Sequence, residues 1–320
     1  MTDASTNIKP SITIIIPFLN EKENIPHLVG ALNHHFGQDC GFDTKLIFVD
    51  DGSTDGSYDL ITEQLQTCNV PSKALKLSKN VGSHAALRAG IANAKTDYIT
   101  FMYADLQDPL EVVQQQFEKI HKQNDIVWAH RASTQSKLKE SFFSKWYASL
   151  MKKYVSKSFP KNGFDIVMFN QKVAEQLNLN QEKNSSIFLQ ILIMGFKQAS
   201  IYYNKQERKR GKSKWTWKKK MKLFIDSFIG FSYFPIRVVT YTGIGFSILG
   251  LLWTLYIILR KIILNDLQTG WPALISILMI GFGITNLGLG IIAEYLWRTL
   301  DQTKKRPVYI IDEVFENMVD

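Results

Sequence analysis

Cysteine is scarce in this chain of 320 residues, which contains only Cys40 and Cys68. Two cysteines do not provide a disulfide framework, and their spacing is not that of a zinc site. A disulfide-rich secreted scaffold and a zinc-binding module are therefore excluded, and a reducing compartment is favoured. The run Thr2 to Asn7 is polar and lacks the apolar stretch of a signal peptide, so we expect none.

Two common nucleotide-binding motifs are also missing. No G-x-G-x-x-G follows the first expected strand, and the chain has no Walker motif. Nicotinamide-dependent oxidoreduction and P-loop phosphoryl transfer are therefore not expected.

Charge is absent from two long stretches near the C-terminus. Val238 to Leu259 is 22 residues without a charged side chain, and Trp271 to Ala293 is 23 more. Each is long enough to cross a hydrocarbon core of about 30 Å as a helix. The alternative of two buried core helices is disfavoured, because such helices are rarely uncharged over this length. The sequence predicts two transmembrane helices.

Positive charge is concentrated beside these stretches. The formal net charge is +9, and Lys205 to Lys222 alone has ten Lys and Arg residues against one acid, Glu207. The positive-inside rule predicts that the large N-terminal domain and both termini lie in the cytoplasm, in a multi-pass protein of the cell (inner or plasma) membrane. Because anionic lipid headgroups would lie next to the basic run, we expect membrane lipids rather than nucleic acid as its partner.

Short β-branched runs alternate with helical patterns over the first 131 residues. This alternation predicts an α/β domain with a doubly wound, mainly parallel sheet. The expected strands are Ser11–Ile16, Leu46–Val49, Ala74–Leu77, Tyr98–Met102 and Ile126–Ala129, followed later by Ile166–Phe169, Ala199–Tyr203 and Val308–Ile311. The expected helices are Glu21–Phe36, Asp55–Leu65, Ser83–Ala94, Pro109–His121 and about Leu138–Val155.

The predicted organisation has four parts. Residues 1–214 form the cytoplasmic α/β domain, and the basic, aromatic segment 215–235 forms an amphipathic helix in the membrane interface. Residues 236–297 contain the two transmembrane helices, and residues 298–320 form a cytoplasmic tail with a short strand.

Three polar clusters follow expected strands: Pro17 to Glu21, Asp50 to Ser53 and Asp105 to Asp108. In a doubly wound sheet, ligands bind beyond the carboxyl ends of the strands. Each cluster alone also fits an ordinary turn or helix cap. Together, their acidity fits a divalent cation that bridges a diphosphate better than direct phosphate binding.

The motifs form a recognisable series. The runs IIIPFLNEKENI, VDDGSTDGS, LSKNVGSHAALRAGI and YADLQDP are followed by GFDIVMF, ERKRGKSKW, AEYLWR and RPVYII. In this order, and with two apolar helices, the chain resembles glycosyltransferase family 2 along nearly its whole length. It is similar in particular to the polyisoprenyl-phosphate subgroup, which includes dolichol-phosphate mannose synthase and bactoprenol glucosyltransferases.

The resemblance implies a GT-A-type fold and an inverting glycosyltransferase. One sugar would pass from a UDP- or GDP-sugar to polyisoprenyl (undecaprenyl) phosphate at the cytoplasmic membrane face. The matching nucleotide-binding positions are Pro17, Phe18, Asn20, Glu21 and Asp51, and the matching metal ligands, for Mg²⁺ or Mn²⁺, are Asp105 and Gln107. One departure is Tyr103, where the family's metal motif usually begins with an aspartate.

The remaining matches concern the reacting groups. Asp165 corresponds to an acidic residue near them, and with Asp105 it is an expected catalytic residue. The positions near donor or acceptor phosphates are Arg131, Arg208, Ser213 and Lys214. The donor sugar and the oligomeric state stay open, a homo-oligomer included.

Two other functions compete with this one. A processive polysaccharide synthase is disfavoured, because the Q-x-x-R-W signature is absent and two helices are few for a polymer channel. A membrane-bound nucleotide-sugar binder with impaired catalysis is suggested by Tyr103 alone.

Overall fold

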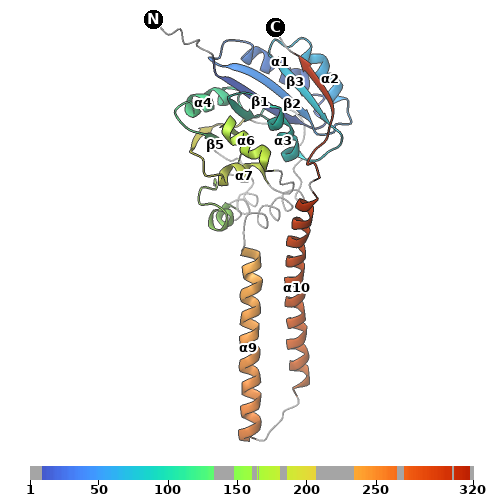
Figure 1. The fold of residues 1–320 in the computed structure, drawn as a ribbon, viewed down its shortest axis with the longest axis vertical. Helices are drawn as coiled ribbons and strands as arrows, with labels where there is room; N and C mark the ends of the chain where they lie inside the picture. Colours follow the sequence, from blue (N-terminus) through green and yellow to red (C-terminus); the bar gives the residue numbers. More distant parts are fainter. Residues whose placement is uncertain are drawn as a thin grey trace. The chain divides into compact units, whose positions relative to one another are not determined.

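The computed structural model describes residues 9–132, 148–160, 164, 166–180, 186–206, 234–264, 270–304 and 306–317. The chain divides into two compact units, Met1–Phe224 with Pro307–Asp320, and Ile225–Arg306. The first unit is an α/β domain and the second consists of two long helices (Figure 1).

Strands and helices alternate through most of the first unit, as predicted. Its strands are β1 Ser11–Phe18, β2 Asp43–Asp50, β3 Ser72–Leu77, β4 Tyr98–Phe101, β5 Ile126–Arg131, β6 Ile166–Asn170, β7 Gln198–Tyr203 and β8 Ile311–Asn317. Its helices are α1 Ile25–Phe36, α2 Ser57–Leu65, α3 Ser83–Asn93, α4 Glu111–Ile120, α6 Gln171–Leu179 and α7 Ile187–Ile193. Of the helix predicted over Leu138–Val155, the structure describes residues 148–155, and 148–154 are helical.

The eight strands form one sheet in the order β7-β5-β6-β4-β1-β2-β3-β8. The pairs β1–β2, β1–β4, β2–β3 and β5–β7 are parallel, whereas β3–β8, β4–β6 and β5–β6 are antiparallel. The sheet is therefore mixed: parallel pairing, as predicted, holds for the central strands β4, β1, β2 and β3 and for the outer pair β5–β7, and the other three pairs are antiparallel. Strand direction after β5 was not readable from the alternation, because β6 runs against both of its neighbours.

Helices cover both faces of the sheet (Figure 1), and the apolar sequence of the central strand β1 accounts for this arrangement. Residues 12–18 of β1 are all buried, and such a continuous apolar run is typical of a strand covered on both sides. Ile14 packs in a core cluster with Leu28 of α1 and Ile61 of α2. On the opposite face, α3 approaches β1 at Gly90, where a Cβ would collide with the Ile15 side chain.

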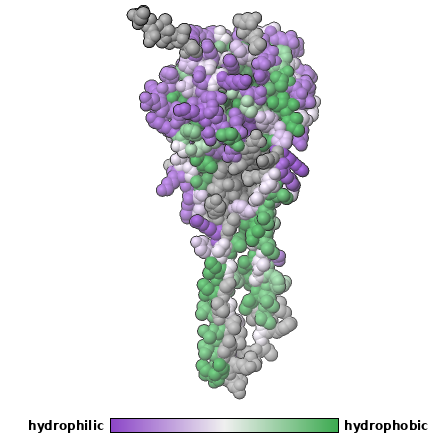
Figure 2. All heavy atoms as spheres, viewed as in Figure 1, coloured by the Kyte–Doolittle hydropathy of each residue, from purple (hydrophilic) through white to green (hydrophobic). Residues whose placement is uncertain are grey.

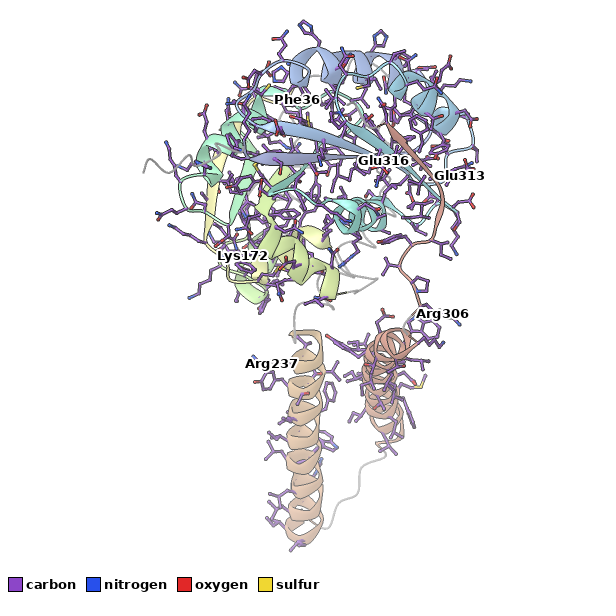
Figure 3. The ribbon with its side chains drawn as sticks, turned by 45° about the horizontal axis from the view of Figure 1, so that its top comes forward. Phe36, Lys172, Arg237, Arg306, Glu313 and Glu316 are labelled. Atoms are coloured by element: carbon purple, nitrogen blue, oxygen red, sulfur yellow. The ribbon has the colours of Figure 1, made fainter. Side chains whose placement is uncertain are left out.

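The last strand returns to the first unit after the two long helices. It begins at Ile311 and not at Val308 as predicted, since residues 308–310 form the connection to it. β8 pairs with β3 at the sheet edge, where Lys73 lies 3.3 Å from Glu316 and Lys76 bonds Glu313. Figure 3 shows Glu313 and Glu316 on this strand.

The second unit consists of α9 Phe234–Leu264 and α10 Trp271–Thr303, of 31 and 33 residues. Both extend beyond the uncharged stretches, because Arg260, Lys261 and Glu294 are compatible with a helix. Apolar side chains cover their described surfaces (Figure 2), and the two helices touch where Gly288 is buried against Val239. Such small residues allow close helix packing.

One segment of the described chain, Ile277–Trp297 in α10, is long and apolar enough to cross a membrane. Only 6% of it is buried, unlike a core helix of a soluble protein. The span predicted over Val238–Leu259 does not reach the same criterion among the described residues, so a second span remains a prediction. Of the predicted interfacial segment, residues 215–233 lie outside the described residues.

Candidate active site at the carboxyl edge of the sheet

The predicted site residues that the structure describes lie at one edge of the sheet because of strand direction. β1, β2 and β4 are parallel, and β5 and β7 run the same way, so their carboxyl ends meet at one edge. β6 runs oppositely, so its amino end lies at that edge too. Asp165 directly precedes β6 in the sequence and is itself outside the described residues.

The loops after β1 and β2 are joined by hydrogen bonds. The Asn20 backbone N–H donates to Ser53 Oγ at 2.8 Å, and Asn20 Oδ1 accepts from the Thr54 N–H at 2.8 Å. The Glu21 N–H donates to Ser57 Oγ at 3.0 Å. Asn20 has φ +50°, a left-handed conformation that asparagine tolerates better than most residues. The loop after β1 is therefore held against the loop after β2 by these hydrogen bonds, and Pro17 and Phe18 before it are buried.

Asp51 holds the loop before α3 in place beside the loop after β2. It is buried, and its carboxylate accepts N–H groups from Val81 at 2.8 Å and from Gly82 at 3.0 Å. These contacts fix the loop before α3 against the end of β2. Gly52 allows the loop after β2 to lie this close to the loop before α3. It has φ +75°, and a Cβ at this position would lie 2.6 Å from the Asn80 backbone nitrogen.

The neighbouring Asp50 stabilises the same turn through hydrogen bonds from Ser53. It is fully buried, and its Oδ1 accepts from the Ser53 N–H at 3.0 Å and from the Ser53 hydroxyl. Burial raises the pKa of the Asp50 carboxyl above its ordinary value, while the bonds from Ser53 oppose the rise. Asp50 therefore serves the architecture of the turn.

The loop after β4 contains the predicted metal ligands. Asp105 Oδ1 accepts the Gln107 N–H at 3.3 Å, and Leu106 between them has φ +52°. A left-handed leucine is costly, and such strain is concentrated at functional sites. Among the described residues no three His, Cys, Asp or Glu side chains gather. Asp105 and Gln107 still offer oxygen ligands suited to Mg²⁺, which often takes one or two carboxylates and completes its shell with substrate phosphates.

A buried ionic contact joins this loop to the end of β7. Lys205 Nζ lies 3.1 Å from Asp108 Oδ1, and the Tyr203 hydroxyl donates to the same oxygen at 2.6 Å. The Lys205 ammonium also lies over the Tyr103 ring, 5.7 Å from its centroid. The Gln206 N–H completes the junction by donating to the Gln107 carbonyl at 2.9 Å.

The phosphate-binding predictions are only partly covered by the structure. Arg131 ends β5 at the same sheet edge and is half-buried. Arg208, Ser213 and Lys214 lie outside the described residues. On the face of β5 and β7 bearing Trp128 and His130, a cavity of about 440 Å³ is also lined by Phe164, which directly precedes Asp165 in the sequence.

Sequence reasoning missed several residues that shape this edge. Ser53 and Ser57 were considered only as part of a motif. In the structure their hydroxyl oxygens accept hydrogen bonds from the backbone N–H groups of Asn20 and Glu21 in the loop after β1. Lys205 was counted as one charge in a basic run, and no sequence signal distinguished it from the others. Its partner Asp108 was noted in a cluster, but burial of 99% of its side chain was not foreseeable.

Comparisons with known proteins agree with this description. The family description "Glycosyl transferase family 2" matches residues 13–178. The chain is 32% identical to a prophage bactoprenol glucosyl transferase homolog of Escherichia coli, over 95% of this chain and 99% of that protein. It is 31% identical to the uncharacterized glycosyltransferase YkcC of Bacillus subtilis, over 95% and 94% of the two chains.

Among solved structures, the mannosyltransferase PcManGT of Pyrobaculum calidifontis, in complex with GDP-Man and Mn²⁺, is 16% identical with a TM-score of 0.44. The match covers 63% of this chain and 59% of that one. The family assignment depends on the sequence matches, which confirm the predicted resemblance and include the named bactoprenol transferases. The chain belongs to glycosyltransferase family 2.

Proposed function

We propose that the protein transfers one sugar from a UDP- or GDP-sugar to a polyisoprenyl phosphate, such as undecaprenyl phosphate, with inversion at the anomeric carbon. The observation that carries this proposal is the likeness to bactoprenol glucosyl transferases over 94–95% of the chain. That likeness extends through the two long helices as well as the α/β domain. A lipid-linked acceptor accounts for both parts of the molecule.

The acceptor phosphate is the nucleophile. Its second pKa is near 6, so it is largely a dianion at pH 7 and needs no strong base. One phosphate oxygen forms a bond to the anomeric carbon while the bond from that carbon to the donor diphosphate breaks. The nucleoside diphosphate leaves with the bonding electron pair. The protein's main task is therefore to hold two anionic groups together.

The carboxyl edge of the sheet is suited to that task. The hydrogen-bonded loops that contain Asn20, Glu21 and Asp51 would hold the nucleoside, and Arg131 would attract phosphate oxygens. Asp105 and Gln107 would ligate a divalent cation, Mg²⁺ or Mn²⁺, which would neutralise charge on the diphosphate. Asp165 would orient the acceptor or stabilise the positive charge that develops on the sugar.

The acceptor segment and the membrane complete the proposal. Arg208, Ser213 and Lys214 would grip the lipid phosphate at headgroup depth, with the basic run also attracting anionic lipids. Both α9 and α10 would span the membrane, and the catalytic domain and both termini would face the cytoplasm. The charge distribution around the two uncharged stretches supports this orientation.

The test is a transfer assay with the purified full chain in detergent. Undecaprenyl phosphate is incubated with each common UDP- and GDP-sugar in radiolabelled form, and the lipid products are separated by chromatography. We expect one donor to give a lipid with a single sugar. A labelled polymer would instead indicate a processive synthase, and nucleotide-sugar binding without any product would indicate the impaired binder.

A further inference from the structure

The loop of residues 78–82 joins β3 to α3 and forms one side of the proposed nucleoside site. Asp51 accepts hydrogen bonds from the Val81 and Gly82 N–H groups of this loop, at 2.8 Å and 3.0 Å. The loop itself has neither helical nor strand structure. Because its backbone groups have no helix or sheet partners, its conformation depends on the contacts that hold it from outside.

A segment from the other end of the chain lies against the start of this loop. Residues 308–310 lead from α10 into β8, and the Ser78 N–H donates to the Ile310 carbonyl at 3.0 Å. Ser78 directly follows the last residue of β3, which lies beside β8 (Figure 1). This hydrogen bond therefore continues the pairing of the two strands into the loop.

The same segment also approaches α3, at the other end of the loop. Tyr309 is half-buried, and Val308 before it is buried. Burial raises the pKa of the Tyr309 phenol above its ordinary value, and the charge of the nearby Arg88 guanidinium opposes the rise. Arg88 is a buried residue of α3 and donates to the Asn180 carbonyl at 2.6 Å. The segment thus lies beside both elements that the loop joins.

We propose that residues 308–310 hold the loop of residues 78–82 in place for nucleotide binding, with Tyr309 and Ile310 as positioning residues. A loop that is held by Asp51 alone would populate other conformations. The apparent affinity of a ligand falls in proportion to the fraction of molecules that have the binding conformation. The inference rests on the proposed nucleoside site and adds to it a segment from the far end of the sequence.

Substitutions of Tyr309 test this role through nucleotide binding. UDP and GDP are each titrated by calorimetry into the full chain in detergent with Mn²⁺ present. We expect Tyr309→Ala to raise Kd about 10-fold, as when one molecule in ten has the loop in place. Tyr309→Phe retains the ring and should change Kd by less than about two-fold.

The matched control for the lost packing is Tyr98→Ala. Tyr98 is also a half-buried tyrosine, but it begins β4 and so lies at the amino edge of the central strands. Both alanine variants should unfold at a lower temperature than wild type, since both lose buried apolar surface. Only Tyr309→Ala should lose nucleotide affinity, and equal losses in the two variants would overturn the positioning role.

Hydrogen–deuterium exchange without nucleotide measures the loop directly. The Val81 and Gly82 amides exchange only when the loop leaves Asp51, so their rates report its opening. In Tyr309→Ala, a peptide that contains both amides should exchange at least about 10-fold faster than in wild type, because the loop is then open in most molecules. Tyr98→Ala and Tyr309→Phe should match wild type.

Charge reversals on β8 give a second test that leaves Tyr309 intact. Glu313 pairs with Lys76 near the loop, whereas Glu316 pairs with Lys73 three residues farther from it. Each substitution by lysine places like charges across the two strands and weakens their pairing by a similar amount. Glu313→Lys should speed exchange of residues 78–82 by about 2- to 5-fold, and Glu316→Lys should not.

The outcomes separate this inference from the proposed function. Wild-type exchange of the loop in both Tyr309→Ala and Glu313→Lys overturns the inference, even when the protein transfers sugar. Faster exchange with unchanged nucleotide affinity overturns the link to nucleotide binding. Wild type that binds neither UDP nor GDP refutes the proposed nucleoside site, while faster exchange in Tyr309→Ala and Glu313→Lys alone still supports the role of residues 308–310 in holding the loop.

Discussion

The Asp51 carboxylate accepts the backbone N–H of Gly82, with both oxygens within 3.1 Å of the nitrogen. This contact joins the end of β2 to the loop that starts α3. A second amide, from Val81, donates to the same carboxylate. Asp51 therefore shapes one wall of the proposed nucleoside site.

The substitution Asp51→Asn tests whether this contact shapes the proposed nucleoside site. An amide retains one acceptor oxygen and presents an NH₂ group to a backbone N–H, so at least one bond to Val81 or Gly82 is lost. We expect the KM for the nucleotide sugar to rise about 10-fold, which corresponds to roughly 1.4 kcal/mol. Asp59→Asn, at an exposed position of α2, is the control. Unchanged donor KM in Asp51→Asn would contradict the assignment.

Gly90→Ala and Gly30→Ala form a matched pair for the core. A methyl group at Gly90 collides with Ile15 of β1, and such overpacking costs about 1–3 kcal/mol. At Gly30, exposed on α1, a Cβ meets nothing within 4 Å, so alanine should stabilise the helix by up to about 1 kcal/mol. Thermal unfolding in detergent measures both. Shifts of the same sign for the two variants would disagree with the packing described.

Asp105→Asn tests the proposed cation site. Loss of its single carboxylate should lower kcat by at least about 100-fold, since electrostatic stabilisation of the leaving diphosphate is weakened. Excess EDTA should abolish wild-type transfer, and Mn²⁺ or Mg²⁺ should restore it. Glu118→Gln, an exposed acid on α4, is the control. Full activity of Asp105→Asn in EDTA would refute the cation site.

The environment of His84 leads us to expect that the fold is less stable in acid. Burial and the nearby Arg88 guanidinium lower the pKa of His84 to about 4. The unfolded state, with a histidine pKa near 6.5, binds the proton more readily, so stability falls by up to about 3 kcal/mol as pH drops from 6.5 to 4. His84→Gln should show a smaller decrease in unfolding temperature between pH 7 and pH 5 than wild type. The exposed His34→Gln should match wild type, and identical pH dependence in His84→Gln would exclude this explanation.

Cysteine labelling tests the membrane topology. Both native cysteines are first replaced by serine, and Gln268→Cys is placed in the segment between the two helices. We expect a membrane-impermeant maleimide to label it in intact cells, whereas Lys122→Cys in the α/β domain should react only after permeabilisation. Labelling of Gln268→Cys only after permeabilisation would reverse the proposed orientation.

The sequence predicted the central part of the fold well, because β1 to β5 are short apolar runs separated by clear helical patterns. The directions of β6 and β8 were not predictable, since antiparallel pairing depends on connections with no sequence period of their own. The positions of Asn20, Asp51 and Asp105 at the carboxyl edge of the sheet were predictable because their motifs directly follow β1, β2 and β4, and their binding roles stay predictions. The Asp108–Lys205 pair joins positions almost a hundred residues apart, and no local pattern announces such a contact.

The final strand has a consequence for how the molecule is made. β8 follows α10 in the chain, yet it covers the edge of β3 in the catalytic sheet. During synthesis, the edge of β3 that pairs with β8 stays unpaired until both long helices have been translated. An open strand edge can pair with other chains, so a chain arrested before β8 is synthesised would have an incomplete sheet and would be prone to aggregate. The eight-stranded sheet can therefore be completed only after both apolar helices have been synthesised.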